Sequence, residues 1–275
     1  MLKKLLKYDF KSVMKFWWIA ALSSFVLSFI GGICIKALNT NREFPQIVNV
    51  FLVLGLILVI LSFVVFTILS VIFVYTRFYK NFFTDEGYLT FTLPVTRAQL
   101  LNSKLITSVV TLMLTSLVCI VNVCVMVITG FSEEIFTKAF WQGFGDVVRV
   151  FVEELGVYLG VYLVEGFVIV LLSTVSSTLF IFCCITFASI IAKKAKVLTA
   201  IAIYYVANGV LSFVVQIFTL FVTTSLEAWV DKLPLQNTYV VFALIALGLI
   251  YCFSVFCAML YTLQHWMLDR KLNLS

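Results

Sequence analysis

Residues 77–104 read RFYKNFFTDEGYLTFTLPVTRAQLLNSK and stand between two long apolar runs. Water must reach this stretch, because it carries six charged side chains: Arg77, Lys80, Asp85, Glu86, Arg97 and Lys104. It also carries many aromatic and apolar side chains, unlike an ordinary solvent loop: Phe78, Tyr79, Phe82, Phe83, Tyr88, Leu89, Phe91, Leu93 and Val95. Apolar side chains outside the bilayer core need a cover, so we expect the membrane surface or another protein to lie against this stretch.

Local signals within residues 77–104 predict a helix, a sharp break and a second helix. Gly87 can adopt the left-handed backbone that ends a helix. Pro94 favours an extended conformation at Leu93, and Thr96 and Gln99 have the spacing of a capping box at the start of the next helix. The simpler alternative is a tight interfacial turn that joins two membrane spans.

The composition of the whole chain identifies it as an integral membrane protein. Of its 275 residues, 63% are hydrophobic and only 12% are charged, and the mean hydropathy is +1.14. These values lie far outside the range of soluble globular domains. The seven cysteines all lie in apolar runs, without a histidine at metal-binding spacing. We therefore interpret them as small packing residues.

The hydropathy pattern predicts an all-α integral membrane protein with six transmembrane helices in one transmembrane domain over residues 1–275. The predicted spans are residues 16–35, 47–75, 105–130, 166–192, 197–223 and 239–263. An amphipathic helix over residues 1–15 is expected to lie in the inner headgroup layer. Helices on the outer surface are expected over residues 131–154, and a short interfacial helix over residues 226–233.

The distribution of basic residues predicts the orientation of the chain. The segments assigned to the inner side hold 14 of the 19 lysines and arginines, and the outer segments hold the other five. Positive charge accumulates on the cytoplasmic side of membrane proteins, so both termini and residues 77–104 are expected in the cytoplasm. The expected location is the plasma membrane, which the chain crosses several times.

The sequence shows no catalytic pattern, and we expect no enzymatic activity in this chain. It has no GxxxxGK[ST] loop for nucleotide phosphates and no GxSxG elbow, and its single histidine, His265, cannot supply a two-histidine metal site. Glu165 is the only charged residue in 155–192. It lies ~42 Å of helix from Lys193 and is therefore expected at the outer rim of the membrane.

Ion-coupled transporters usually need an intramembrane acid, base or broken helix to bind the driving ion, and the predicted spans have no charged residue near the membrane centre. The candidates to line a polar path are Asn208, Ser173, Ser176 and Ser177. Helix packing is the alternative for each of them, because an asparagine forms interhelical hydrogen bonds and small polar residues let helices approach. Gly156 and Gly160 have the spacing of a weak helix-packing signal.

Residues 83–95, followed by Gln99, Leu100, Leu101, Ser103 and Lys104, resemble the second cytoplasmic segment of bacterial type-2 ATP-binding-cassette (ABC) transporter permeases. Residues 1–11 look similar to the amino end of the same proteins, whereas the rest of the chain matches only in hydropathy outline. The resemblance implies an ATP-driven exporter of the bacterial plasma membrane, in which residues 77–104 couple the permease to a separate ATPase subunit.

The same resemblance implies partners and docking residues. A second permease subunit, identical or paralogous, would complete the pore, and ATP and Mg²⁺ would bind the ATPase, so this chain would hold no cofactor. The residues implied to dock on the ATPase are Phe82, Phe83, Asp85, Glu86, Gly87, Tyr88 and Phe91. The alternatives are a non-transporting membrane scaffold or sensor that recruits a cytoplasmic partner and, disfavoured by the single histidine, an intramembrane hydrolase. No nucleic-acid partner is expected.

Overall fold

The computed structural model describes residues 2–40, 45–84, 87, 95–156, 158–192, 195–230 and 235–270, and nearly all of them are helical. No strand occurs within these ranges, in agreement with the all-α prediction. In chain order the helices are α1 (Leu2–Asn39), α2 (Gln46–Phe83), α4 (Arg97–Gly130), α5 (Ser132–Ile135), α6 (Lys138–Leu155), α7 (Tyr158–Ile191), α8 (Lys196–Val230) and α9 (Leu235–Arg270).

Six of the helices are long and apolar enough to cross a membrane. They cover Lys3–Asn39, Gln46–Phe83, Arg97–Gly130, Tyr158–Ile191, Lys196–Ile217 and Tyr239–Asp269. The predicted number of six transmembrane helices is therefore confirmed for the described part of the chain.

Two predicted surface helices are continuous with spans. The helix α1 runs without interruption from Leu2, so the basic amino-terminal turns and the first span form one element. Its 38 residues are about 57 Å long, which exceeds the ~30 Å hydrocarbon core, and part of α1 therefore projects beyond that core. The helix α8 likewise continues to Val230, into the predicted short helix over residues 226–233, whereas Pro234 lies outside the described residues.

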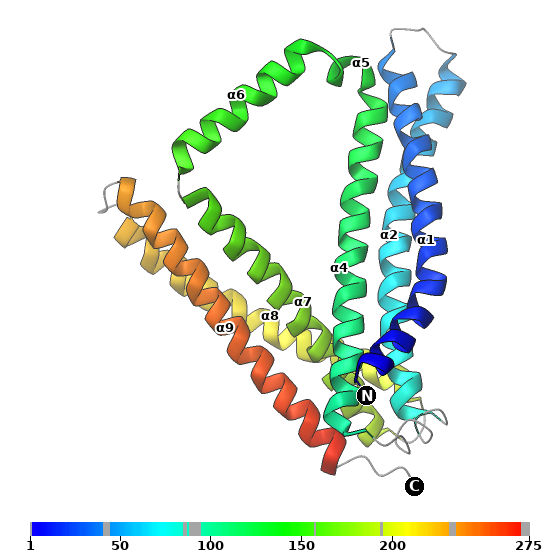
Figure 1. Ribbon diagram of the computed structural model, residues 1–275, viewed down its shortest axis with the longest axis vertical. Helices are drawn as coiled ribbons and strands as arrows, with labels where there is room; N and C mark the ends of the chain where they lie inside the picture. The colour runs from blue at the N-terminus through cyan, green and yellow to red at the C-terminus, as the bar shows by residue number, and fades with distance from the viewer. Residues whose placement is uncertain are drawn as a thin grey trace. The chain divides into compact units, whose positions relative to one another are not determined.

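The chain divides into two compact units, one made of residues 1–77 and 106–156 and the other of residues 78–105 and 157–275. In the first unit, α1, α2 and α4 run side by side (Figure 1). In the second unit, α7 packs against both α8 and α9 (Figure 1).

A polar seam joins α1 to α4 in the first unit. The side-chain amide of Asn122 donates a hydrogen bond of 2.9 Å to the Ser24 hydroxyl, and the Ser28 hydroxyl donates to the backbone carbonyl of Asn122. The Trp17 indole N–H donates to the Thr115 hydroxyl at 2.9 Å. All five side chains are buried. Such bonds hold helices together within a bilayer, where no water competes for the same groups.

The helices of the first unit approach closely at two adjacent glycines of α1. A Cβ atom added to Gly32 would lie 2.6 Å from the Cβ of Thr129 and 2.9 Å from the Met126 carbonyl oxygen. One added to Gly31 would lie 2.9 Å from a methyl group of Val59. These contacts exclude any side chain at Gly32 unless the backbone shifts.

Gly156 and Gly160 do not have the close-packing role that their spacing suggests, because nothing lies within 4 Å of either Cβ position in the described structure. Gly156 instead ends α6. Its φ is 49°, and its N–H bonds to the Val152 carbonyl at 2.9 Å. Glycine adopts this left-handed backbone without steric cost, so the chain can leave the helix here.

The core of the second unit is built around α7. The Phe182 ring stacks on the Phe78 ring with centroids 3.7 Å apart, and Phe82 packs against Phe78 with centroids 4.9 Å apart. Between α7 and α9, the Gln264 amide donates a hydrogen bond of 2.7 Å to the Thr186 hydroxyl. All these side chains are buried.

Cysteines fill two further contacts between α7 and α9. The Cys183 thiol lies 3.5 Å from the Leu260 carbonyl oxygen, and the Cys257 thiol lies 3.7 Å from the Leu172 carbonyl oxygen. All seven cysteines are free. These positions agree with the interpretation of the cysteines as packing residues.

Candidate functional site

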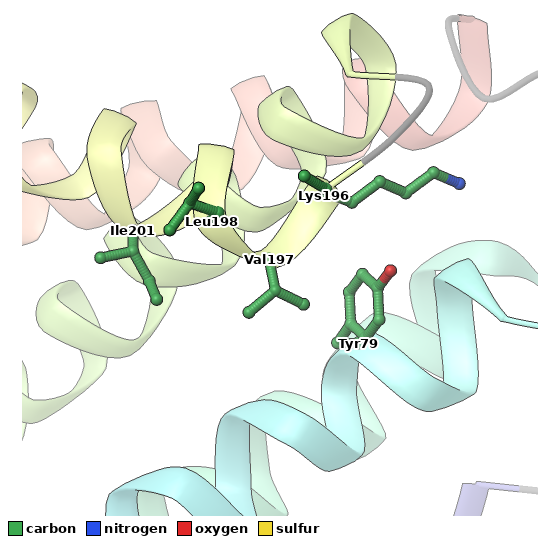
Figure 2. A pocket seen from close by; sticks show the side chains of 6 residues that line it. Tyr79, Lys196, Val197, Leu198 and Ile201 are labelled. Atoms are coloured by element: carbon green, nitrogen blue, oxygen red, sulfur yellow. The ribbon is translucent and has the colours of Figure 1, made fainter.

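A groove of about 670 Å³ lies in the second unit, where the last turns of α2 face the beginning of α8. Tyr79 of α2 forms one side of it, and the other side consists of Ala195, Lys196, Val197, Leu198 and Ile201. Figure 2 shows the Tyr79 ring pointing toward the start of α8, with the Val197 side chain opposite it and the Lys196 chain extending past the ring. The groove therefore combines a phenol and an ammonium group with an aliphatic wall.

The backbone at the groove is shaped by Ala195, which has a φ of 57°. This left-handed conformation costs an L-amino acid with a side chain roughly 1–2 kcal/mol. Ala195 accepts the first backbone hydrogen bond of α8, from the Thr199 N–H at 3.1 Å, so it occupies the N-cap position. The strained residue thus sets the direction in which α8 leaves the turn.

The beginning of α8 has an electrostatic pattern that favours an anion. The first N–H groups of a helix lack intrahelical acceptors, and the alanine side chain at the N-cap has no oxygen to accept from them. The first turn of α8 contains no acidic residue, and it contains the cation Lys196. A lysine at the positive end of the helix dipole is unfavourable by itself, whereas an anion bound there would interact with the dipole, the N–H groups and the ammonium group together.

The wall of the groove suits an acyl chain. Val197, Leu198 and Ile201 are exposed, and they begin a helix that is apolar enough to cross the membrane. Lys80, next to Tyr79 on α2, is also exposed. An anionic head beside Lys196 and an aliphatic tail along α8 would therefore both find suitable partners.

Of the predicted docking residues, the structure describes Phe82, Phe83 and Gly87, and none of these three is exposed. Phe82 is only 2% exposed and belongs to the aromatic core with Phe78 and Phe182. Phe83 is half-buried and Gly87 is buried. The remaining predicted docking residues lie outside the described part of the chain: Asp85, Glu86, Tyr88 and Phe91.

The local signals in the same stretch have a mixed outcome. Gly87 does not have the predicted left-handed φ; its hydrogen atom is needed instead because a Cβ there would lie 2.8 Å from the Phe82 carbonyl oxygen. The predicted cap at Thr96 is confirmed, since its hydroxyl accepts from the Gln99 N–H at 3.3 Å and α4 begins at Arg97. Arg97 also holds the end of α9, donating to the Leu268 carbonyl at 2.7 Å.

The predicted path residues of α7 bond to their own helix. Ser173 donates to the Val170 carbonyl, Ser176 to the Ser173 carbonyl and Ser177 to the Thr174 carbonyl, at 2.9, 3.0 and 3.0 Å. Their hydroxyls are therefore satisfied without a polar path, and this geometry favours the packing alternative.

Asn208 is exposed on α8, away from the serines of α7 in the chain. It forms no side-chain hydrogen bond with any residue that the structure describes, so the interhelical bond given as its alternative role is not seen in the described part of the chain.

Two features of the second unit were not evident in the sequence. Glu165 is 6% exposed and therefore buried within the protein, and its Oε2 atom has no hydrogen-bond partner among the described residues. The pairing of Tyr79 with Lys196 was also missed, because they are far apart in the chain. The signals available were the Tyr79 phenol within a charged stretch and the lysines that precede α8. No group of three or more histidine, cysteine or acidic residues is placed to bind a metal within the described ranges.

Comparison with known proteins gives one match. A family model described as RTA1 like protein matches residues 3–142, just over half of the chain. No curated protein and no solved structure matches.

This match corrects the interpretation drawn from residues 83–95. The matched region includes that stretch and three of the spans, and it assigns them to a different family from the ABC permeases. The exporter function, the ATPase docking role and the bacterial assignment depended on the resemblance, and they are withdrawn with it.

Proposed function

The chain belongs to the RTA1-like family, and we propose that it is a multi-pass membrane protein that binds an anionic phospholipid in the groove between Tyr79 and the beginning of α8. The observation that carries the proposal is the composition of this groove. Tyr79, Lys196 and the N-cap residue Ala195 line it together with the aliphatic side chains of Val197, Leu198 and Ile201.

Each part of the lipid has a partner in this arrangement. A phosphate oxygen is attracted by Lys196 and accepts hydrogen bonds from the first N–H groups of α8. The Tyr79 hydroxyl donates a further hydrogen bond to the headgroup. Val197, Leu198 and Ile201 contact the first part of the acyl chain, which remains within the hydrocarbon layer. A soluble phosphate would make the polar contacts but not those with Val197, Leu198 and Ile201, so a lipid is the better ligand.

We further propose that the groove faces the inner leaflet. The inner segments predicted from the sequence, including residues 77–104 and 193–196, hold 14 of the 19 lysines and arginines. The inner leaflet is also where anionic lipids accumulate, and each basic residue near its surface contributes about 1 kcal/mol of attraction. Both termini lie on the same side as the groove in this arrangement.

The proposal is tested by measuring how many phosphatidylglycerol molecules remain bound to the purified protein in phosphatidylcholine nanodiscs, with native mass spectrometry as the readout. Lys196→Gln should weaken phosphatidylglycerol binding about five-fold, which corresponds to the attraction of one basic residue. Tyr79→Phe removes only the hydroxyl and should weaken binding about three-fold, as expected for one hydrogen bond. Phosphatidylcholine binding should change in neither variant.

The matched control is Lys80→Gln, which makes the same charge change next to Tyr79 at a side chain that does not line the groove. It should weaken phosphatidylglycerol binding less than Lys196→Gln does. Equal losses in the two lysine variants would mean that the attraction is diffuse, and the groove would then not be the site. Free phosphate that competes as well as the lipid would exclude the role of the aliphatic wall.

A further inference from the structure

One face of α8 carries polar side chains from the middle of its membrane span to the far end of that span. Asn208, Ser212 and Gln216 follow one another at intervals of four residues, which places them on the same side of the helix. All three are exposed. This polar stripe, defined by Asn208, Ser212 and Gln216, lies within the span Lys196–Ile217.

The stripe begins near the middle of the span and reaches its far end at Gln216, 20 residues or ~30 Å of helix after Lys196. Asn208 is 12 residues after Lys196 in the same helix, or ~18 Å along its axis, which is close to the middle of a hydrocarbon core about 30 Å thick. The amides of Asn208 and Gln216 make no hydrogen bonds with other described residues. An amide that faces lipid without a partner is costly, so a polar surface is expected to cover the stripe.

The packing of α8 within the second unit leaves the stripe uncovered. The half-buried positions of its middle turns include Ala200, Ile203 and Ala207, which lie on another side of the helix. A Cβ added to Gly209, beside Asn208, would have open space within 4 Å in the described structure. The backbone of another helix can therefore approach closely at this point.

The exposed surface of the first unit offers no matching amide in the described middle turns of its spans. Asn122 is fully buried in the seam between α1 and α4. The exposed hydroxyls of Ser23, Thr67 and Ser116 are each bonded to a carbonyl of their own helix. The surface that complements an amide stripe is therefore another amide stripe, since each amide has both a donor and an acceptor.

We propose that α8 pairs with the α8 helix of a second copy of this chain through Asn208, Ser212 and Gln216. A two-fold axis parallel to the membrane normal relates the two copies, and it runs between the two α8 helices. The stripe of one copy then lies against the stripe of the other, so that each amide meets an identical group. The small side chains of Gly209 and Ser212 let the two helices approach within hydrogen-bonding reach. The inference depends on this stripe alone and is independent of the lipid groove.

Cysteine crosslinking in intact membranes tests the contact. The parent chain has the exposed Cys124 and Cys252 replaced by alanine, and Asn208→Cys is oxidised with copper phenanthroline. The matched control is Val210→Cys, which is also exposed but lies on the opposite side of α8. Asn208→Cys should form a covalent dimer at a yield at least about ten-fold above that of Val210→Cys. A contact that favours one face of α8 over the opposite face by a factor of ten gives this ratio.

Equal dimer yields from the two cysteine variants would overturn the proposal. An Asn208→Cys chain that stays monomeric would also overturn it, because lipid or another part of the same chain would then cover the stripe. A second measurement does not depend on crosslinking. Energy transfer between differently labelled copies in vesicles measures the dissociation constant of the dimer. This constant should be about ten-fold larger in the Asn208→Ala, Gln216→Ala chain, and it should return towards its original value in Asn208→Gln. Unchanged energy transfer in a folded alanine variant would also exclude the pairing.

Discussion

At the scale of single residues, Gly32 is the described glycine with the least room for a side chain. A Cβ there would lie 1.5 Å from the Thr129 Oγ1 and 2.9 Å from the Met126 carbonyl oxygen, so rotating the threonine alone does not make room. Gly32→Ala should lower the free energy of unfolding by about 1–3 kcal/mol, the usual cost of overpacking. Thermal unfolding in detergent measures this, with Gly166→Ala as the control, because Gly166 has open space around it.

Ala195 leads to a prediction of the opposite sign. Its φ of 57° is unfavourable for alanine and favourable for glycine, so Ala195→Gly should stabilise the protein by about 0.5–1 kcal/mol despite the greater freedom of glycine in the unfolded chain. The control is Ala202→Gly in the interior of α8, which should destabilise it by about 1 kcal/mol. Chemical denaturation of both variants compares the two signs directly, and a loss of stability in Ala195→Gly would contradict the strain at this residue.

The sequence predicted residue roles well where the signal is local. The cap at Thr96 depends on positions three residues apart, and it is confirmed. The surroundings of Gly87 and Glu165 depend on the path of the folded backbone, which spacing along the chain does not reveal. Gly87 lies against the Phe82 carbonyl, five residues earlier in the chain, and Glu165 is buried, which its distance from Lys193 does not indicate.

At the scale of elements, the seam between α1 and α4 depends on Asn122. Asn122→Ala removes the donor to Ser24, whose hydroxyl keeps the hydrogen bond that it donates to the Ala21 carbonyl at 2.8 Å. The free energy of unfolding should fall by about 1 kcal/mol, as expected for one hydrogen bond between membrane helices. Thermal unfolding in detergent provides the measurement. Ser23→Ala is the control, because Ser23 is exposed and bonds to its own helix, and it should change stability by less than about 0.5 kcal/mol.

Helix number was easier to predict than helix ends. Hydropathy identifies an apolar run, but a helix can continue beyond that run where no helix-ending residue, such as glycine or proline, follows it. The helix α1 therefore includes the basic turns that were expected as a separate surface helix, and the Asp9–Arg77 ion pair of 3.6 Å supports those turns from α2. The end of α6 shows the converse, since Gly156 stops it with a positive φ.

At the scale of the whole molecule, composition predicted the class of protein and a short resemblance predicted the wrong family. Thirteen residues at 83–95 carried most of the ABC assignment, and Phe82, its first aromatic docking residue, is a core side chain. The six spans alone are compatible with many functions, because every chain that places several apolar helices in a bilayer has a similarly high content of apolar residues. The groove at Tyr79 and Lys196 is specific to the folded chain, since it forms only when α2 and α8 are brought together.

The six spans also predict which parts of the chain share a side of the membrane. Three of them, α1, α2 and α4, lie between Lys3 and Gly143, and the other three, α7, α8 and α9, lie between Gly143 and the carboxyl end. If each of these helices crosses the membrane once, an odd number of crossings separates Gly143 from each terminus, which predicts that the two termini lie together and α6 opposite to them. The excess of basic residues in the segments on the side of the termini predicts that this side is the cytoplasm.

Single cysteines at Lys3, Gly143 and Ser275, in a chain with Cys124 and Cys252 replaced by alanine, test this arrangement in sealed cells. A membrane-impermeant maleimide should label Gly143→Cys in intact cells, and it should label Lys3→Cys and Ser275→Cys only after the membrane is opened. Labelling of all three positions from one side would require an even number of crossings in each half. Such labelling would contradict the six spans, whereas an inverted pattern would retain them and place the lipid groove in the outer leaflet.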